Sequence, residues 1–178
     1  ARDRVLNRDV AVKLLRPDAG PTPPTVGRFV EEARITGRLQ HPGIPPVHDL
    51  GVLPDGRPFM AMKLIRGRTL ADLVAHDRPP LPELLRTFED VCHAVAYAHD
   101  RRVIHRDLKS ANVMVGAFNE VQVMDWGLAK ALGDGPAPAA APAPAAAGVE
   151  SVIESGRDPN SYTRAGSTMG TPAYMPPE

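Results

Sequence analysis

A polar segment in the middle of the chain carries the side chains best suited to chemistry. It reads His105-Arg106-Asp107-Leu108-Lys109-Ser110-Ala111-Asn112 and lies between segments with the apolar patterns of buried elements. A solvated loop would explain this polarity. It would not explain a carboxylate, an amine and an amide at Asp107, Lys109 and Asn112, at offsets of two and five residues. This spacing indicates a reaction site.

Transfer of a phosphoryl group would use all three side chains. Its transition state is loose, so catalysis consists mainly of positioning and charge neutralisation. The carboxylate of Asp107 would orient an attacking hydroxyl and accept its proton, and the cation of Lys109 would offset the developing charge. The amide oxygen of Asn112 can bind Mg²⁺, which prefers oxygen ligands. Asp125, which follows a predicted hairpin, supplies a carboxylate ligand.

Four segments of the chain resemble a known family. The polar segment resembles the catalytic loop of eukaryotic-type protein kinases, and Asp125-Trp126-Gly127 resembles their metal-binding triplet. Val10-Ala11-Val12-Lys13 resembles their lysine-bearing strand, and Gly170 to Glu178 resembles the end of their activation segment. The four segments occur in the family's order, cover essentially the whole chain and are most similar to bacterial Ser/Thr kinases.

The resemblance implies roles for further charged residues. Lys13 would contact the α- and β-phosphates of ATP and pair with Glu32 of the following helix. The family pattern of Phe, two residues and Glu-Ala selects Glu32, whereas Glu31 matches an ordinary surface carboxylate. The implied catalytic residues are Asp107, Lys109, Lys13 and Glu32, and the implied ligands of Mg²⁺ are Asn112 and Asp125.

The resemblance also implies an adenine pocket. Ala11 and Met114 would enclose the ring, and Met62 would lie at the back of the pocket. Backbone groups of Lys63 and Ile65 would bond the adenine edge. The apolar positions could equally be plain core, and only the resemblance favours contact with a ligand.

Other matching positions are implied to be structural or regulatory. His105 would pack under Trp126 and not act as a base. Arg106 resembles the residue that couples kinases to phosphorylation of their activation segment, because a phosphate offers several acceptor oxygens to an arginine. Thr171, in the substrate-side loop, would contact the catalytic loop. The candidates for regulatory phosphorylation are Thr163, Ser167 and Thr168.

The chain also departs from the family pattern. Trp126 replaces the commoner Phe, and an insert between Leu132 and Tyr162 lengthens the activation segment. No glycine-rich loop precedes Lys13, and the chain stops at Glu178. We therefore expect a truncated domain, weak or inactive by itself, in which the strand bearing Lys13 is an unprotected sheet edge.

The predicted fold is the two-lobed α+β fold of protein kinases, incomplete at both ends. Residues 1–62 would form the small lobe, 63–67 the hinge and 68–178 part of the large lobe. Within the large lobe, 125–178 would be the activation segment. Residues 133–148, almost wholly Ala, Pro and Gly, would be a disordered insert, because they offer no large apolar groups to bury. A docking ligand of the PxxP type is the alternative.

Local patterns predict the individual elements. Strands are expected at 10–15, 47–52 and 59–64, with a hairpin over 113–124. Helices are expected after a cap at Thr25, after Gly67 and from Leu84 to Ala96. The Pro-rich stretch 19–25 predicts a loop. Cys92 lies on the apolar spacing of the third helix, which predicts a buried and inert thiol.

Composition excludes several classes of protein. Basic and acidic residues balance at 21 each, which gives no general attraction to nucleic acid or to an anionic membrane. No apolar stretch is long enough to span a bilayer. The single cysteine suits a reducing cytosol. We expect a cytoplasmic segment, whose parent protein could be anchored to a membrane elsewhere.

The expected reaction is transfer of the γ-phosphate of ATP, with Mg²⁺, to Ser or Thr hydroxyls of substrate proteins. Lys109 and Thr171 resemble the Ser/Thr class rather than the Tyr class. One alternative is an inactive kinase fold that serves as a binding or scaffold module, although all the phosphate and metal residues are present. A phosphotransferase for small molecules is the other alternative, and it fits Lys109 and the segment 170–178 less well.

Overall fold

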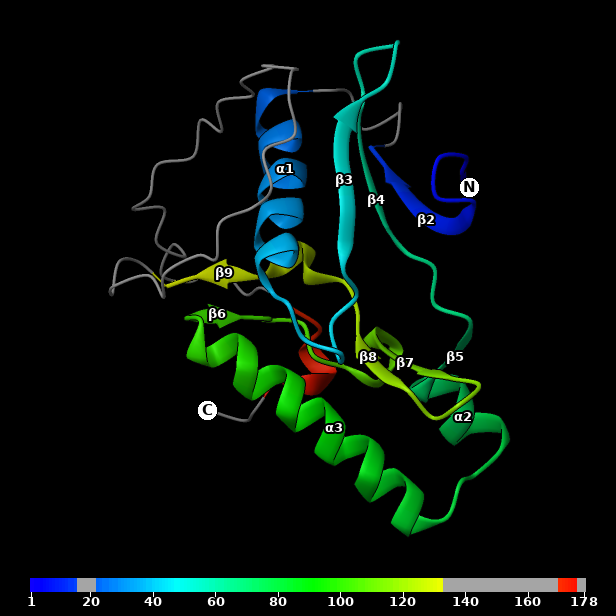
Figure 1. Ribbon diagram of the computed structural model, residues 1–178. Helices are drawn as coiled ribbons and strands as arrows, with labels where there is room; N and C mark the ends of the chain where they lie inside the picture. The colour runs from blue at the N-terminus through cyan, green and yellow to red at the C-terminus, as the bar shows by residue number, and fades with distance from the viewer. Residues whose placement is uncertain (16–21, 133–169, 176–178) are drawn as a thin grey trace.

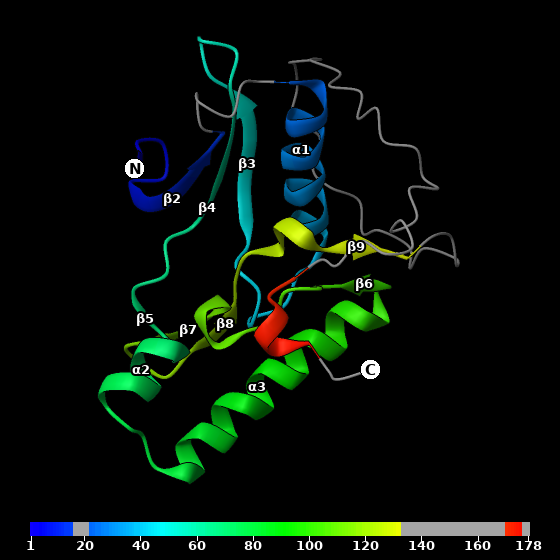
Figure 2. The ribbon, with the colours of Figure 1, turned by 180° about the vertical axis from the view of Figure 1, so that it is seen from behind.

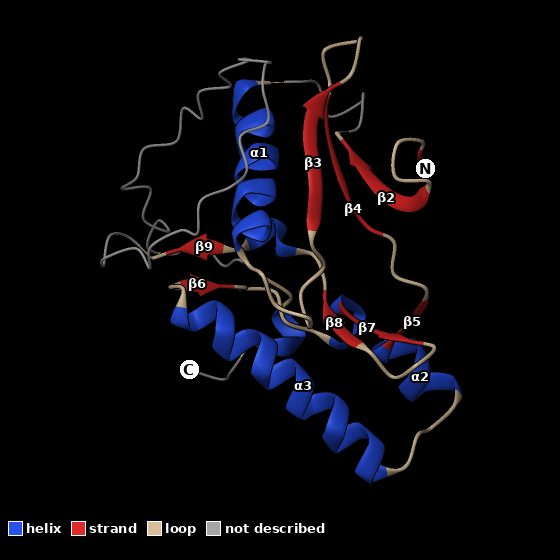
Figure 3. Cartoon of the chain, in the orientation of Figure 1, coloured by secondary structure: helices blue, strands red, loops and turns tan. Residues whose placement is uncertain are grey.

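The computed structural model describes residues 1–15, 22–132 and 170–175, which form two regions (Figure 1). The upper region holds a four-stranded antiparallel sheet, in the order β1-β2-β4-β3, beside one long helix (Figure 3). Its elements are β1 (Arg2–Asp3), β2 (Arg8–Leu14), α1 (Pro23–Arg38), β3 (Val47–Val52) and β4 (Pro58–Lys63).

The lower region is mainly helical and carries two small sheets. The strand order in one sheet is β5-β7-β8, and the other pairs β6 with β9. Its elements are β5 (Gly67–Thr69), α2 (Leu70–His76), α3 (Leu81–Asp100), β6 (Val103–Ile104), β7 (Val113–Gly116), β8 (Val121–Val123) and β9 (Lys130–Ala131). Short 3₁₀ turns occupy Ser110–Asn112, Trp126–Leu128 and Pro172–Tyr174.

The strands lie close to the positions that their apolar patterns predict. β3 has the expected bounds, and β2 and β4 begin and end within two residues of them. The turn between β3 and β4 is closed by hydrogen bonds from Leu53 N to Arg57 O and from Gly56 N to Leu53 O. β5 was not predicted, because three residues are too few to show a period. The connection between β4 and β5 falls within the predicted hinge, 63–67, while the lobe boundaries themselves stay a prediction.

The helix α1 begins earlier than expected, so the prediction of a cap at Thr25 is wrong. The helix starts at Pro23, and Thr22 occupies the N-cap position. Proline suits the first helical positions, because its fixed φ matches the helix and its missing N–H would have no partner there. The predicted Pro-rich loop therefore ends in the first turn of α1. The inner face of the helix is apolar, since Phe29, Val30 and Ala33 are buried.

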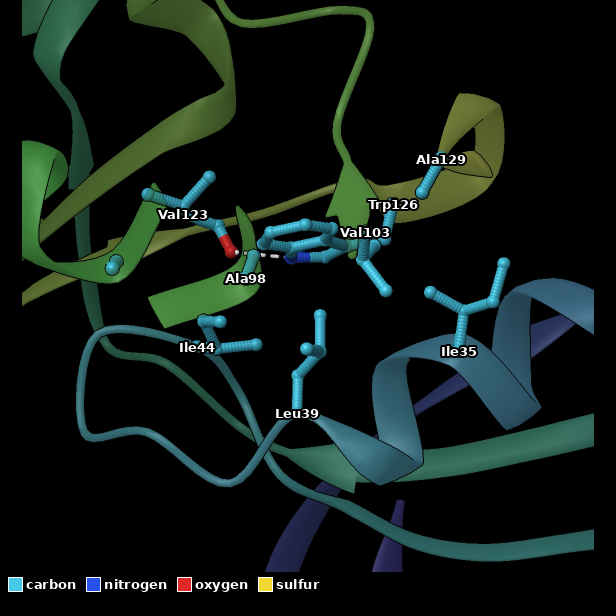
Figure 4. Packing of buried hydrophobic residues seen from close by; sticks show 9 residues of the cluster. Ile35, Leu39, Ile44, Ala98, Val103, Val123, Trp126 and Ala129 are labelled. Carbon is cyan, nitrogen blue, oxygen red and sulfur yellow. Dashed lines mark hydrogen bonds between the residues drawn. The ribbon is translucent and has the colours of Figure 1, made fainter. Parts of the chain in front are cut away.

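A single apolar cluster joins the two regions around Trp126 (Figure 4). Ile35 of α1 and Leu39 and Ile44 beyond it belong to this cluster, together with residues of α3, β6 and β8. The indole N–H of Trp126 donates to Val123 O at 3.0 Å, so its one polar group is satisfied. Burial of this ring fixes the segment that follows β8, and therefore the place of Asp125.

The burial of α3 differs from the sequence prediction. Thr87, Ala94 and Ala98 are its buried residues, whereas Leu85 and Phe88 are 57% and 64% exposed. Cys92 is exposed, so the prediction that it lies in the core is wrong. The reason is that α3 carries apolar residues on more than one stripe. The described elements β6 and β8 pack against the stripe with the smaller side chains.

The strand that bears Lys13 is less exposed at its edge than expected. β1 pairs with the first residues of β2 in the register Arg2↔Asp9 and Asp3↔Arg8. The predicted unprotected edge is therefore covered at that end. None of the described helices has the length and apolar character needed to cross a bilayer. The predicted disordered insert, 133–148, lies outside the described residues.

Candidate active site

His105 anchors the polar loop to the interior. Its ring lies 4.6 Å from that of Trp126, and its Nδ1 accepts from the N–H of Asp107 at 3.2 Å. Nε2 lies 2.9 Å from Met124 O, a contact that requires a proton on this nitrogen. Burial lowers the pKa of His105, which keeps the ring neutral. The ring therefore positions Asp107 through its backbone, in agreement with the structural role predicted for it.

Asp107 is the centre of a hydrogen-bond network. Lys109 Nζ donates to its Oδ2 at 2.7 Å, and the Thr171 hydroxyl donates to its Oδ1 at 2.6 Å. Lys109 Nζ also donates to Thr171 Oγ1 at 2.9 Å, which closes a triangle. The hydrogen bond from Lys109, followed by that from Thr171, lowers the pKa of Asp107 below its ordinary value. The carboxylate is therefore ionised at neutral pH and held in one orientation.

Asn112 is held so that its amide oxygen remains available. Its Nδ2 donates to the carbonyl oxygen of Asp107 at 2.9 Å and to Oδ2 at 3.2 Å. Among the described residues, no hydrogen bond reaches Oδ1 of Asn112. The N–H of Met124 donates to Asn112 O at 2.7 Å, which ties the loop to the residue before Asp125.

Asp125 has a left-handed backbone, with φ 58° and ψ 70°. Its side chain is 55% exposed, and its Oδ1 lies 3.7 Å from Lys13 Nζ. An exposed carboxylate and the available amide oxygen of Asn112 fit Mg²⁺, which binds few protein oxygens and completes its shell with water and phosphate. The described residues contain no group of three or more His, Cys, Asp or Glu that could hold a metal without such help.

Lys13 joins the sheet to α1. Its Nζ lies 2.5 Å from Glu32 Oε1, in a pair whose carboxylate is only 10% exposed. The ion pair predicted for these two residues is thus present. Gly127 lies close beside it, because a Cβ there would be 3.2 Å from both Glu32 Oε2 and Asp125 Oδ1. The absence of a side chain at Gly127 lets α1 approach the triplet.

The residues predicted to bind adenine come from three strands. Ala11 on β2 lies opposite Met62 on β4, and Met114 lies on β7 opposite Thr69. The N–H of Lys63 donates to Pro46 O at 3.1 Å, so only its carbonyl could bond an adenine. Ile65 lies between β4 and β5. Their roles in binding stay predictions.

The segment 170–175 lies against the polar loop (Figure 2). Gly170 has φ 111°, and a Cβ there would be 2.6 Å from Arg106 O, so a side chain would push the two backbones apart. Arg106 Nε donates to Leu128 O at 2.7 Å. The sequence did not indicate the close approach of Gly170, nor a contact between Ser110 and Tyr174. The candidate phosphorylation sites Thr163, Ser167 and Thr168 lie outside the described residues and stay predictions.

Comparison with known families identifies this arrangement. The sequence pattern of the protein kinase domain matches residues 1–178. The chain belongs to the protein kinase domain family. The α+β architecture is therefore that of a protein kinase domain, as the sequence predicted, while the catalytic and binding roles of the site residues stay predictions.

The chain is similar to named bacterial protein kinases. It is 37% identical over 182 residues to the serine/threonine-protein kinase PknB of Mycobacterium tuberculosis and to that of Mycolicibacterium smegmatis, with 100% of this chain and 25% of each relative aligned. It is 32% identical over 191 residues to the serine/threonine-protein kinase PknD of Protochlamydia amoebophila, with 100% of this chain and 18% of that relative aligned. The chain thus spans about a quarter or less of the length of these curated relatives.

Proposed function

We propose that the protein carrying this chain transfers the γ-phosphate of ATP to Ser or Thr hydroxyls of proteins. The observation that carries this proposal is the triangle of Asp107, Lys109 and Thr171, which presents an ionised carboxylate beside a fixed cation. Membership of the protein kinase domain family and similarity to proteins named serine/threonine-protein kinases support it. We place the reaction in the cytoplasm, where ATP is available.

Each member of the triangle has a distinct task in this proposal. Asp107 accepts a hydrogen bond from the substrate hydroxyl and aims its oxygen at the phosphorus atom. Because its pKa is lowered, Asp107 acts mainly by orientation and takes the proton only as the hydroxyl becomes acidic late in the transfer. Lys109 neutralises charge on the transferred group and holds Thr171 beside it.

The second network would bind the nucleotide phosphates. Lys13, held by Glu32 at 2.5 Å, presents one ammonium group in a fixed position. Asn112 and Asp125 are the residues that would hold Mg²⁺, which supplies charge neutralisation of the phosphates when bound. The hydrogen bond from Met124 N to Asn112 O fixes the backbone of Asn112 relative to the residue before Asp125, and so helps to fix the distance between the two metal-binding residues. Positioning of this kind is the main source of catalysis in phosphoryl transfer.

Substitution of Asp107 tests the proposal. Asp107→Asn in the full-length protein should retain nucleotide binding and lose about 10²–10⁴ in the rate of transfer to a Ser/Thr protein substrate, the usual effect of losing such a group. Asp100→Asn, which changes an exposed carboxylate at the end of α3, is the matched control and should leave the rate unchanged. A near-wild-type rate in Asp107→Asn would refute the role. Nucleotide binding without any transfer by the wild-type protein would favour a binding module instead.

A further inference from the structure

An ion pair links β2 to the connection between β4 and β5. Arg66 Nη2 donates to Asp9 Oδ2 at 2.7 Å, although the two residues are 57 positions apart in the chain. Asp9 belongs to β2 of the upper region, and Arg66 directly precedes β5 of the lower region. Arg66 lies in the predicted hinge, 63–67, but neither residue was assigned a role from the sequence. The ion pair therefore crosses from one region to the other.

Each end of this connection is fixed to a different region. Lys63, the last residue of β4, pairs with β2 in the upper region. Gly67, the first residue of β5, pairs with β7 in the lower region. Within the connection, backbone rotation that changes the angle between the regions is thus confined to residues 64–66. The Asp9–Arg66 ion pair spans this segment and limits its rotation, because it ties Arg66 to β2.

Asp9 lies on the same strand as Lys13 and on the same side of it. Side chains two and four residues apart in a strand point to the same face of the sheet, so Asp9 shares its face with Ala11 and Lys13. Lys13 Nζ lies 3.7 Å from Asp125 Oδ1 of the lower region. The strand is thus held to the lower region near both ends, by Arg66 at one end and by Asp125 at the other.

We propose that the Asp9–Arg66 ion pair positions β2 for nucleotide binding, and that both residues are positioning residues for the nucleotide. The proposal rests on the proposed function, in which Lys13 and Asp125 act on one nucleotide from different regions. Such a nucleotide binds more tightly when the separation of the regions is already set, because less conformational freedom is lost on binding. The ion pair is exposed and adds little to stability, so its effect should appear in binding rather than in folding.

Nucleotide affinity in the full-length protein tests the ion pair without any need for phosphate transfer. Asp9→Asn and Arg66→Gln should each raise the Kd for ADP with Mg²⁺, measured by calorimetry at low salt, by about two- to fivefold, the range for exposed ion pairs. The double variant should raise the Kd no further, because each single change breaks the same pair. At about 1 M salt the differences from wild type should largely vanish, because the Debye length falls to about 3 Å.

The direction of the two effects separates this role from a direct attraction between charge and nucleotide. Loss of the negative charge of Asp9 would by itself strengthen binding of an anionic nucleotide, whereas loss of the link to Arg66 weakens it. Asp77→Asn is the matched control, because it breaks a similarly exposed ion pair, with Arg68, that lies inside the lower region. This variant should leave the Kd for ADP unchanged.

The possible outcomes decide the inference and the proposed function separately. An unchanged Kd in both single variants, a lowered Kd in Asp9→Asn, additive effects, or an equal rise in Asp77→Asn would overturn the inference. A wild-type protein that binds ADP but transfers no phosphate would overturn only the proposed function, since the Kd values still decide the inference. A wild-type protein that binds no nucleotide would overturn both. Thermal melting of each variant identifies any effect that comes from unfolding.

Discussion

The Thr171 hydroxyl donates to Oδ1 of Asp107 at 2.6 Å, across 64 positions of the chain. Thr171 belongs to the segment 170–175, which is far along the chain from the loop that carries Asp107. The hydrogen bond places this segment against that loop. The hydroxyl also accepts from Lys109. The hydrogen-bond network around Asp107 is thus assembled from two segments, the polar loop and residues 170–175.

Removal of this hydroxyl should impair transfer. Thr171→Ala deletes one hydrogen bond to Asp107 and leaves Lys109 with one partner fewer, so we expect a roughly ten- to hundredfold loss in kcat/KM, as for hydrogen bonds to charged groups. Thr171→Ser retains the hydroxyl and should stay within about threefold of wild type by the same reasoning. Steady-state kinetics with a protein substrate measures both. Equal losses in the two variants would show that the methyl group, and not the hydroxyl, matters.

The two adjacent carboxylates of α1 should differ in importance. Glu32→Gln removes the charge that holds Lys13 and should lower kcat/KM for ATP by roughly tenfold or more, because the ammonium group of Lys13 loses the carboxylate that fixes its position. Glu31→Gln is the matched control, because Glu31 forms no ion pair with any described residue. Its kinetics should equal those of the wild type. A comparable loss in Glu31→Gln would contradict the assignment of Glu32.

Stability should depend on pH through His105. Burial lowers its pKa in the folded state, whereas in the unfolded chain it titrates near 6.5. Between these two values the unfolded state binds the extra proton, so the free energy of unfolding falls as pH falls, by at most about 1.4 kcal/mol per pH unit. Burial also lowers the pKa of His41 and of His48, which act in the same direction.

A variant isolates the contribution of His105 to this dependence. His105→Phe keeps an aromatic ring against Trp126 but cannot titrate. We expect lower stability at neutral pH, because the bond to Met124 O is lost, together with a shallower decline below pH about 6.5. Denaturant unfolding at several pH values gives both quantities. Parallel curves for the wild type and the variant would rule out His105 as a source of the pH dependence.

Two glycines should respond in opposite ways to alanine. A Cβ at Gly67 would lie 2.2 Å from Val115 O, so Gly67→Ala forces β5 away from β7 and should lower the free energy of unfolding by about 1–3 kcal/mol. A Cβ at Gly27, inside α1, would meet nothing within 4 Å. Gly27→Ala should therefore raise stability by about 0.5–1 kcal/mol. Thermal or denaturant unfolding of the pair tests both, and destabilisation by Gly27→Ala would contradict the open space described there.

Some features of this protein follow from local sequence. The strands and the hairpin appear where short apolar runs and turn residues predict them, because strand formation and turn geometry depend on neighbouring residues. The charged residues of the candidate site were also identified, since their spacing within one loop is visible in the chain. Their resemblance to a family then supplied the pairing of Lys13 with Glu32, which spacing alone could not indicate.

Other features were decided only by tertiary structure. The start of α1 shifted because two prolines that suggested a loop are equally suited to a first helical turn. The buried side of α3 could not be predicted, because apolar residues lie on more than one stripe and only the packed neighbours select among them. The contacts of Thr171 with Asp107 and of Tyr174 with Ser110 join residues 64 positions apart. These contacts form only when the folded chain brings the two segments together, and a local sequence pattern cannot predict that arrangement.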